Sequence, residues 1–185
     1  MLGNLHITED WTLFLDRDGV INHEKKEDYI RNWSEFKFYT ESLAALPLLA
    51  QKFDRIIITT NQKGIGKKLM TTDDLNYIHQ NMQLHIESAG GRIDKIYYCS
   101  DLDDTSINRK PNPGMAFQAK ADYPLIDFSK SFMIGNKLSD MQFGRNAGMN
   151  TVYLATTNPE VSFTHPDIDF RFNTLFEFAT ALITK

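Results

Sequence analysis

The stretch "WTLFLDRDGVIN" at residues 11–22 sets an apolar run directly against two aspartates that flank a single arginine. Residues 12–15 form a short apolar run that ends at charged residues, as a buried strand does. A strand that ends in Asp16-Arg17-Asp18-Gly19 brings two carboxylates into one small region of space. Two such groups repel each other unless a cation or ligand offsets their charge. The stretch therefore predicts a buried strand with a functional site at its end.

Strand and helix patterns alternate along the rest of the chain. Further apolar, β-rich runs lie at residues 55–59, 95–99, 131–134, 151–154 and 170–172. Helical spacing or capping residues mark 41–53, 71–90, 112–123, 139–149 and 174–183. Near-continuous apolar strands are typical of parallel sheets that are covered on both faces. The alternation predicts an α/β fold of three layers, with a doubly wound, mostly parallel sheet and helices on both faces.

We expect one domain over residues 1–185, because the chain of 185 residues contains no repeat, linker or low-complexity tract. Residues 23–40 are polar and aromatic without a clear period, and we interpret them as a loop or small flap after the first strand. Their aromatic residues either line that flap or pack against the domain, and packing is the favoured role: Trp33, Phe36, Phe38 and Tyr39.

Composition narrows the class of protein. The net charge is −4, and Lys and Arg form no long basic block, which argues against a broad nucleic-acid surface. No apolar run approaches the roughly 18 residues that a bilayer requires, and the first residues do not resemble a signal peptide. The single cysteine, Cys99, fits a reducing compartment. We expect a cytoplasmic monomer with no membrane contact.

Polar side chains follow three of the predicted strands, and a lysine precedes a predicted helix. They are Asp16, Asp18, Thr60, Asn61, Lys110, Asn136 and Asp140. Ligands of open α/β sheets bind beyond the carboxyl ends of the strands, so these side chains are expected to converge. Carboxylate and amide oxygens suit Mg²⁺, and a carboxylate is able to attack phosphorus to form an aspartyl-phosphate. The set therefore indicates phosphoryl transfer.

Each of these residues also has a structural interpretation. The Asp16–Asp18 pair alone is compatible with a solvated turn, and Lys110 with a surface lysine. Asn136 is compatible with a turn after the strand, and Asp140 with an acid favoured at a helix start. The order and spacing of all the motifs favour the functional interpretation.

The segment "NQKGIGKK" at residues 61–68 invites a nucleotide-binding interpretation. A Walker A motif requires glycine where Asn61 stands and Ser or Thr where Lys68 stands, so the motif fails twice. We interpret Gly64 and Gly66 as loop flexibility. Lys63, Lys67 and Lys68 are candidate substrate contacts.

Four motifs in order, "FLDRDGVIN", "IIITTNQ", "RKPNPG" and "IGNKLSDM", resemble those of the haloacid dehalogenase (HAD) superfamily. The chain is most similar to the capless subfamily III, which contains phosphatases of D-glycero-D-manno-heptose 1,7-bisphosphate and of histidinol phosphate. The resemblance extends over nearly the whole chain. It implies a Rossmann-like HAD fold without a large cap domain, and a Mg²⁺-dependent phosphatase.

The resemblance also implies roles for the residues at the strand ends. Asp16 would be the nucleophile and a metal ligand. Asp18 would be the general acid and base, with its backbone carbonyl on the metal. Thr60 and Asn61 would hold the transferring phosphoryl group, and Lys110 would neutralise its oxygens.

Three further roles follow from the same resemblance. Arg109 would reach a substrate phosphate or hydroxyl, Asn136 falls on a metal-ligand position, and Asp140 would support the site from behind. Most members have Asp where this chain has Asn136, so one negative charge is missing from the implied metal site.

Many members also bind zinc in a loop built from three cysteines and a histidine. Here only Cys99 remains, with Ser106 and Asn108 where two of the cysteines would stand, and residues 100–104 contain no histidine. Structural zinc normally requires four protein ligands. We therefore expect no structural zinc.

The resulting hypothesis is a Mg²⁺-dependent phosphatase that acts on a small phosphorylated metabolite through an aspartyl-phosphate, with heptose 1,7-bisphosphate as first substrate. Histidinol phosphate is the alternative within the subfamily. An open site would also admit a larger substrate, such as a phosphorylated glycan or a nucleic-acid 3′-phosphate, and the absence of a basic stripe counts against the latter. A catalytically weak phosphate-binding or regulatory protein is the remaining alternative, favoured only by Asn136.

Overall fold

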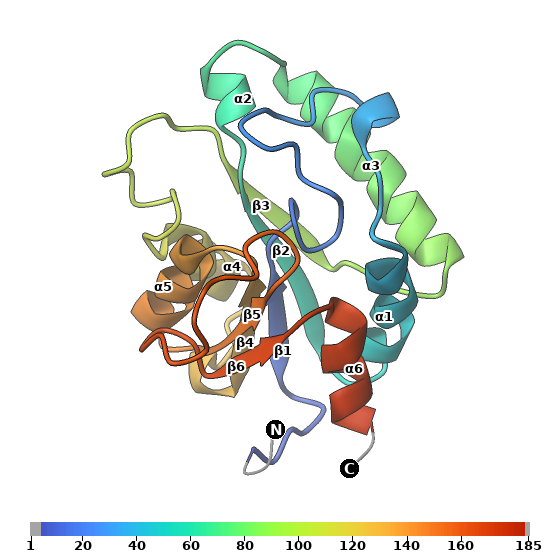
Figure 1. Cartoon of the computed structure of the whole chain (residues 1–185), viewed down its shortest axis with the longest axis vertical. Coiled ribbons are helices and arrows are strands. Elements are labelled where there is room, and N and C mark those ends of the chain that lie inside the picture. Colours follow the sequence, from blue (N-terminus) through green and yellow to red (C-terminus); the bar gives the residue numbers. More distant parts are fainter. Residues whose placement is uncertain (1–4, 184–185) are drawn as a thin grey trace.

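Six parallel strands form a sheet in the computed structural model, which describes residues 5–183. The strands run in the order β3-β2-β1-β4-β5-β6 (Figure 1). Their bounds are β1 Thr12–Leu15, β2 Arg55–Asn61, β3 Lys95–Cys99, β4 Ser131–Gly135, β5 Asn150–Leu154 and β6 Phe170–Phe172. The strands expected from the sequence are confirmed, with β2 and β4 extending slightly further at their carboxyl ends.

Strand β1 lies at the centre of the sheet, between β2 and β4. Its last residue, Leu15, is level with Ile58 of β2 and Ile134 of β4. Strands β2 and β3 follow β1 on one side, and β4, β5 and β6 lie in order on its other side. The order of the strands therefore reverses between β1 and β4. This is the switch point at which open α/β sheets bind ligands. Asp16 follows β1 there, and its N–H donates to the carbonyl of Ile134 at 2.9 Å.

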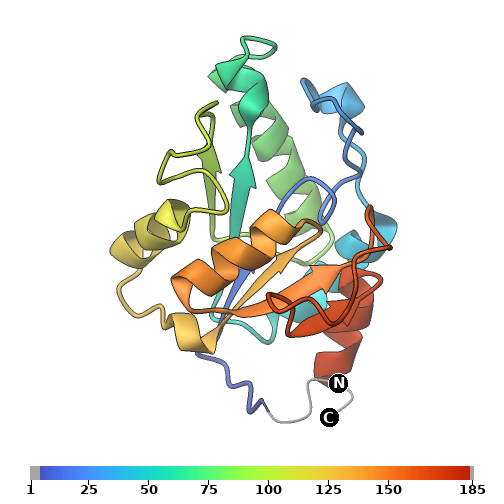
Figure 2. The same cartoon turned by 60° about the vertical axis from the view of Figure 1, so that its left-hand side comes forward.

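Helices cover both faces of the sheet, as predicted (Figures 1 and 2). One face packs against α1 (Thr40–Ala50), α3 (Thr72–Ser88) and α6 (Leu175–Ile183), and the other against α4 (Gly114–Asp122) and α5 (Leu138–Ala147). Successive side chains of β1 point to opposite faces of the sheet. Leu13 and Leu15 therefore belong to the first core and Phe14 to the second. The fold is therefore the three-layer, Rossmann-like arrangement of HAD proteins.

Residues 63–66 differ from the expected flexible loop, because Lys63–Gly66 forms the short helix α2. A Cβ atom on Gly66 would lie 2.3 Å from the backbone carbonyl oxygen of Ser100. The glycine is thus required by close packing against the segment after β3. The sequence pattern missed this turn because four residues with two glycines show no helical period.

Residues 23–39 run irregularly after β1, with only a single 3-10 turn, η1 (Trp33–Glu35), and α1 begins at Thr40. Trp33 and Phe38 lie against the ring of His85 on α3, with centroids 5.1 and 6.0 Å apart, and Phe36 is buried beside them. Tyr39 stacks on His23 instead. Packing is thus the main use of these aromatic side chains, and the segment forms no large cap. Between residues 5 and 183, no helix combines the length and apolar character that crossing a membrane requires.

Candidate active site

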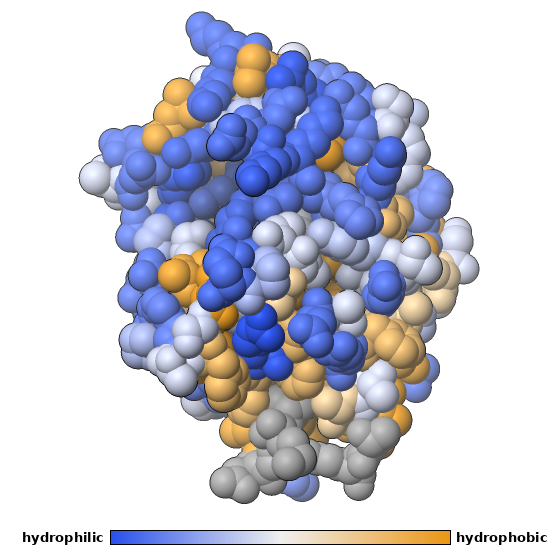
Figure 3. All heavy atoms as spheres, in the orientation of Figure 1, coloured by the Kyte–Doolittle hydropathy of each residue, from blue (hydrophilic) through white to orange (hydrophobic). Residues whose placement is uncertain are grey.

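A cavity of about 740 Å³ opens beyond the carboxyl ends of β1 and β2. Figure 3 shows mostly hydrophilic side chains over the upper half of the molecule, around α2 and the segment after β1. The cavity wall contains residues 24–30 and most of the predicted set: Asp16, Asp18, Thr60, Asn61, Arg109, Lys110 and Asp140. The fold therefore brings together side chains from four separate parts of the sequence.

Lys110 joins two of these carboxylates. Its Nζ lies 2.9 Å from Oδ1 of Asp16 and 2.6 Å from Oδ1 of Asp140, and all three side chains are buried. Burial alone would lower the pKa of the lysine, but Asp140 and Asp16 together raise it above its usual value. The raised pKa favours a charged ammonium group beside Asp16.

Asp140 also begins helix α5. Its Oδ2 accepts a hydrogen bond from the N–H of Lys137 at 3.0 Å, while Oδ1 pairs with Lys110. Both interpretations drawn from the sequence therefore apply, since one carboxylate caps the helix and anchors the lysine. A Cβ atom at Gly135 would lie 2.2 Å from Cβ of Asp140, so the glycine allows the helix to approach the strand end.

Asp16 is held through one of its two oxygens. Oδ1 accepts from the N–H of Arg17 at 2.8 Å and pairs with Lys110, whereas Oδ2 has no protein donor among the described residues. Burial raises the pKa of Asp16 to about 6, against the opposing charge of Lys110. This environment disfavours the free carboxylate and would be relieved by a cation or by transfer of charge to phosphorus.

Asp18 accepts hydrogen bonds from three side chains. Arg17 Nη2 donates to both carboxylate oxygens of Asp18 at 2.9 Å. Asn22 Nδ2 and Gln62 Nε2 each donate to one of these oxygens, also at 2.9 Å. Burial would raise the pKa of Asp18, but the Arg17 guanidinium and these donors hold it below its ordinary value. The described conformation therefore favours the ionised form, which is able to take a proton rather than give one.

Arg17 is itself fully buried. Its NH1 lies 3.1 Å from Nε2 of His79 on α3, and its guanidinium sits 5.9 Å from the ring centre of Phe36. Burial and the neighbouring arginine lower the pKa of His79 to about 3. Because a guanidinium only donates, the neutral imidazole accepts through Nε2. The helix α3 thus helps to fix the arginine that binds Asp18.

Thr60 and Asn61 lie at the end of β2. The Thr60 hydroxyl accepts a hydrogen bond from Gln62 Nε2 at 2.9 Å. The same Gln62 amide also binds Asp18. Asn61 exchanges two hydrogen bonds of 3.1 Å with the backbone of Lys110. The substrate contact expected of Asn61 stays a prediction, and the structure adds that this side chain anchors Lys110.

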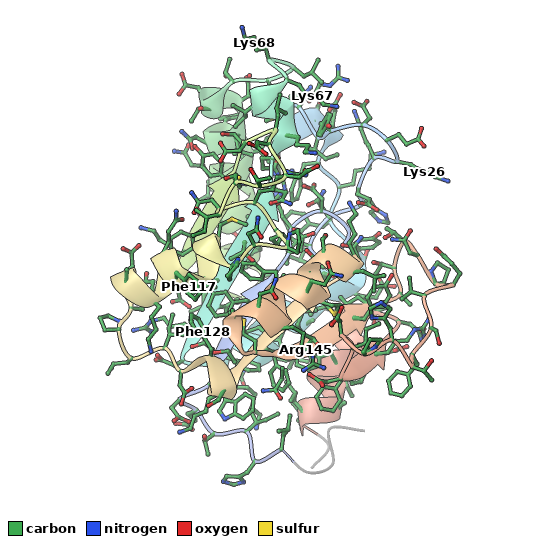
Figure 4. All side chains as sticks on the ribbon, turned by 90° about the vertical axis from the view of Figure 1, so that its left-hand side faces the viewer. Lys26, Lys67, Lys68, Phe117, Phe128 and Arg145 are labelled. Carbon is green, nitrogen blue, oxygen red and sulfur yellow. The ribbon has the colours of Figure 1, made fainter. Side chains whose placement is uncertain are left out.

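Cations surround the outer part of the cavity. Arg109 Nε and Lys63 Nζ share Oδ1 of the exposed Asp104, at 2.8 and 3.2 Å. Lys67 lies over the ring of Tyr29 on the opposite wall, and Lys68 points away from the molecule in Figure 4. Of the three lysines proposed after β2, Lys63 and Lys67 line the cavity and Lys68 is not among its lining residues.

Asn136 follows β4 and is fully buried. Its Nδ2 donates to Thr157 Oγ1 at 2.6 Å and lies 3.5 Å from Oε1 of Glu24, whereas Oδ1 has no hydrogen-bond partner among the described residues. A buried amide oxygen without a partner is costly unless a ligand binds it. Its side chain packs against Gly19, where a Cβ atom would lie 2.1 Å from Nδ2.

These groups fit a hard cation. The orphaned oxygen of Asn136, the Asp16 carboxylate and the backbone carbonyl of Asp18 are all oxygen donors, which Mg²⁺ prefers. Among residues 5–183, no three or more His, Cys, Asp and Glu side chains are grouped to hold a metal. A metal here would therefore depend on an amide and a main-chain carbonyl in addition to Asp16.

Several residues around the site were not anticipated from the sequence. Arg17, Gln62 and Asn22 hold Asp18, and Glu24 lies beside Asn136. For Arg17, its place between the two aspartates was a usable signal. Asn22 and Gln62 stand within the motifs "FLDRDGVIN" and "IIITTNQ", which was also a usable signal. For Glu24 no signal exists, because the direction of a side chain in an irregular segment depends on contacts with distant parts of the chain.

The fold and this site define a phosphatase of the HAD superfamily, with its active centre at the switch point of the sheet. Residues 12–181 match the family model described as Polynucleotide kinase 3 phosphatase. The chain belongs to this family of HAD-like phosphatases.

Individual relatives agree with the family. The D-glycero-alpha-D-manno-heptose-1,7-bisphosphate 7-phosphatase of Mycobacterium tuberculosis is 33% identical over 173 residues, which are 93% of this chain and 91% of the relative. The enzyme of the same name from Campylobacter jejuni is 37% identical over 77% of this chain and 80% of its own. A crystal structure of D,D-heptose 1,7-bisphosphate phosphatase from B. bronchiseptica, complexed with magnesium and phosphate, superposes with a TM-score of 0.86 at 28% identity and covers 94% of this chain and 98% of that one.

Proposed function

We propose that this phosphatase removes a phosphate from a small phosphorylated sugar, with D-glycero-D-manno-heptose 1,7-bisphosphate as the substrate and Mg²⁺ as the cofactor. The buried group of Asp16, Lys110 and Asp140 beside an unpartnered Asn136 oxygen is the observation that supports it best. The names of the relatives support the choice of a heptose bisphosphate over histidinol phosphate.

Asp16 begins the reaction. Its Oδ2, which no protein donor occupies among the described residues, attacks phosphorus while the bond from phosphorus to the substrate oxygen breaks. The product of this step is an aspartyl-phosphate and a free sugar oxygen. Lys110 and the Thr60 hydroxyl would bind the phosphoryl oxygens, and Mg²⁺, when bound, would supply further positive charge for this transfer.

Asp18 moves the protons. It gives a proton to the leaving oxygen in the first step and takes one from the attacking water in the second, which releases phosphate and restores Asp16. Its contacts with Arg17, Asn22 and Gln62 favour the ionised form that the second step uses. The first step would require Asp18 to be protonated before the leaving group departs.

The cavity is consistent with a small polar substrate. Its volume of about 740 Å³ lies within the range of sites for small molecules, and its outer wall carries Lys63, Lys67 and Arg109. These cations are placed to attract a second anionic group of the substrate. We further propose that the protein is a cytoplasmic monomer and that residues 1–185 form a single domain.

A phosphate-release assay with Mg²⁺ and with chelator tests the proposal. The panel contains heptose 1,7-bisphosphate, histidinol phosphate and an oligonucleotide with a 3′-phosphate, and Asp16→Asn serves as the blank. We expect the heptose bisphosphate to give the highest kcat/KM and chelator to abolish release. Release from none of the three would support the alternative of a phosphate-binding protein, and preference for the oligonucleotide would replace the proposed substrate.

A further inference from the structure

Among the cavity carboxylates that neither the sequence motifs nor the proposed chemistry uses, Glu24 is the one that contacts Asn136. Glu24 belongs to the irregular segment after β1 and lines the cavity. Its Oε1 is 3.5 Å from Nδ2 of Asn136, and its Oε2 is 2.6 Å from Nζ of Lys137. The Glu24 side chain is 18% exposed, so its charge is only partly screened by water.

The contacts of Asn136 explain why the orientation of its amide matters. A side-chain amide has two N–H donors and one acceptor oxygen. Thr157 Oγ1 and Glu24 Oε1 both lie on the Nδ2 side, and Gly19 packs against the same group. The acceptor Oδ1 is thereby left without a protein partner among residues 5–183. Turning the amide over would place its oxygen against the Glu24 carboxylate, which is unfavourable.

We propose that Glu24 is a positioning residue for the metal site: it fixes the amide of Asn136 with its oxygen toward the cation and supplies negative charge that an amide at this position lacks. This inference rests on the proposed Mg²⁺-dependent function. Partners behind a metal ligand orient it and increase its basicity, and their loss commonly weakens metal binding by about 10–100-fold. Because Lys137 already neutralises part of the Glu24 charge, we expect an effect near the lower end.

Magnesium affinity tests the inference without reference to catalysis. Isothermal titration calorimetry with Mg²⁺ as the only ligand gives the Kd of the wild type and of Glu24→Gln. We expect the Kd to increase about tenfold in Glu24→Gln. Glu27→Gln is the matched control, since Glu27 lies in the same segment, lines the same cavity and makes no ion pair among the described residues. Its Kd should change less than about twofold. Equal effects of the two variants would overturn the proposal.

A second measurement tests the contact between residues 24 and 136 in the absence of metal. Asn136→Asp replaces the donor beside Glu24 with a second carboxylate, so the Tm in chelator should fall. In Glu24→Gln/Asn136→Asp the repulsion is absent and the Tm should recover. If Asn136→Asp has the same effect on Tm in both backgrounds, Glu24 does not act on this residue and the inference is wrong.

The two proposals fail in different ways. A wild type that neither binds Mg²⁺ nor releases phosphate contradicts the proposed function. A wild type that does both, with Glu24→Gln indistinguishable from it in Kd, contradicts only the role of Glu24.

Discussion

Arg17 has no proposed role in the chemistry, yet the position of Asp18 depends on it. It is fully buried, pairs with Asp18 and contacts His79 of α3. A buried arginine is stable only when its charge and donors are met. Asp18 therefore has a structural partner as well as a proposed chemical role, and the two must be separated by experiment.

Asp16→Asn tests the nucleophile. The substitution removes the attacking carboxylate, so we expect turnover to fall by at least about 10³-fold, on the scale seen when nucleophiles are removed from other enzymes. Steady-state phosphate release under saturating substrate measures it. Turnover close to that of the wild type would exclude an aspartyl-phosphate at this residue.

Asp18→Asn tests the proton transfer. We expect kcat to fall by about 10²–10⁴-fold while competitive inhibition by phosphate persists, because Lys110 and Thr60, the proposed phosphate contacts, remain in this variant. The variant also leaves Arg17 without its charged partner, so its Tm must be measured and the assay run where it is folded. An effect confined to KM would assign Asp18 to substrate binding.

At the scale of elements, Lys110 connects three parts of the fold. It stands in the loop before α4, and its ammonium group binds the end of β1 through Asp16 and the start of α5 through Asp140. Asn61 fastens its backbone to β2. The lysine thus stabilises the arrangement of these elements in addition to its proposed role toward phosphate.

Lys110→Met should therefore weaken the fold in a pH-dependent way. Leaving Asp16 and Asp140 buried without the cation should cost about 3–5 kcal/mol of unfolding free energy. Burial already raises the pKa of Asp16 to about 6, and loss of the lysine would raise it further. A carboxyl group with a higher pKa in the folded than in the unfolded protein binds its proton more tightly when folded. Its contribution to stability is therefore lost as pH rises from about 3.8, the ordinary pKa of Asp, through the raised pKa of the folded protein.

Urea denaturation in chelator at pH 5 and pH 8 measures this effect. The deficit of Lys110→Met relative to the wild type should be larger at pH 8. Lys130→Met, which breaks an exposed pair with Asp10, is the control and should leave the unfolding free energy nearly unchanged at both pH values. An equal deficit of Lys110→Met at both pH values would contradict the coupling to buried carboxyl groups.

The strands could be predicted almost residue by residue, whereas the short helix α2 could not. Buried parallel strands appear in the sequence as short apolar runs, such as residues 13–15 in β1 and 56–58 in β2, because both faces are covered. Lys63–Gly66 owes its shape to the approach of Ser100, which lies in another part of the chain. The same distinction applies to the site: Asp16 and Lys110 follow from motifs, but Glu24 reaches Asn136 only through the path of an irregular segment.

At the scale of the whole molecule, the loop after β3 is the segment in which the sequence predicts no structural zinc. Here hydrogen bonds link its own side chains, from Ser106 to Asp101, from Thr105 to Asp103 and from Arg109 to Asp104. The only sulfur in reach, that of Cys99, is buried as a free thiol. Hydrogen bonds between its own side chains thus hold this segment.

We expect the purified protein to contain far less than one zinc per chain. Elemental analysis of protein prepared without added metal measures this, and the circular dichroism spectrum should not change when a chelator is added. Stoichiometric zinc together with loss of structure on chelation would show that the loop binds metal through ligands not recognised here.

The central position of β1 has a consequence for synthesis on the ribosome. Strand β2 pairs with one edge of β1, but the other edge is filled only by β4, about 70 residues later in the chain. At translation rates of about 5–20 residues per second, that edge stays open for roughly 4–14 s. An unpaired apolar strand of this kind is able to pair with other nascent chains. Yield in cells should therefore depend on translation speed and chaperone supply while residues 61–135 are being made.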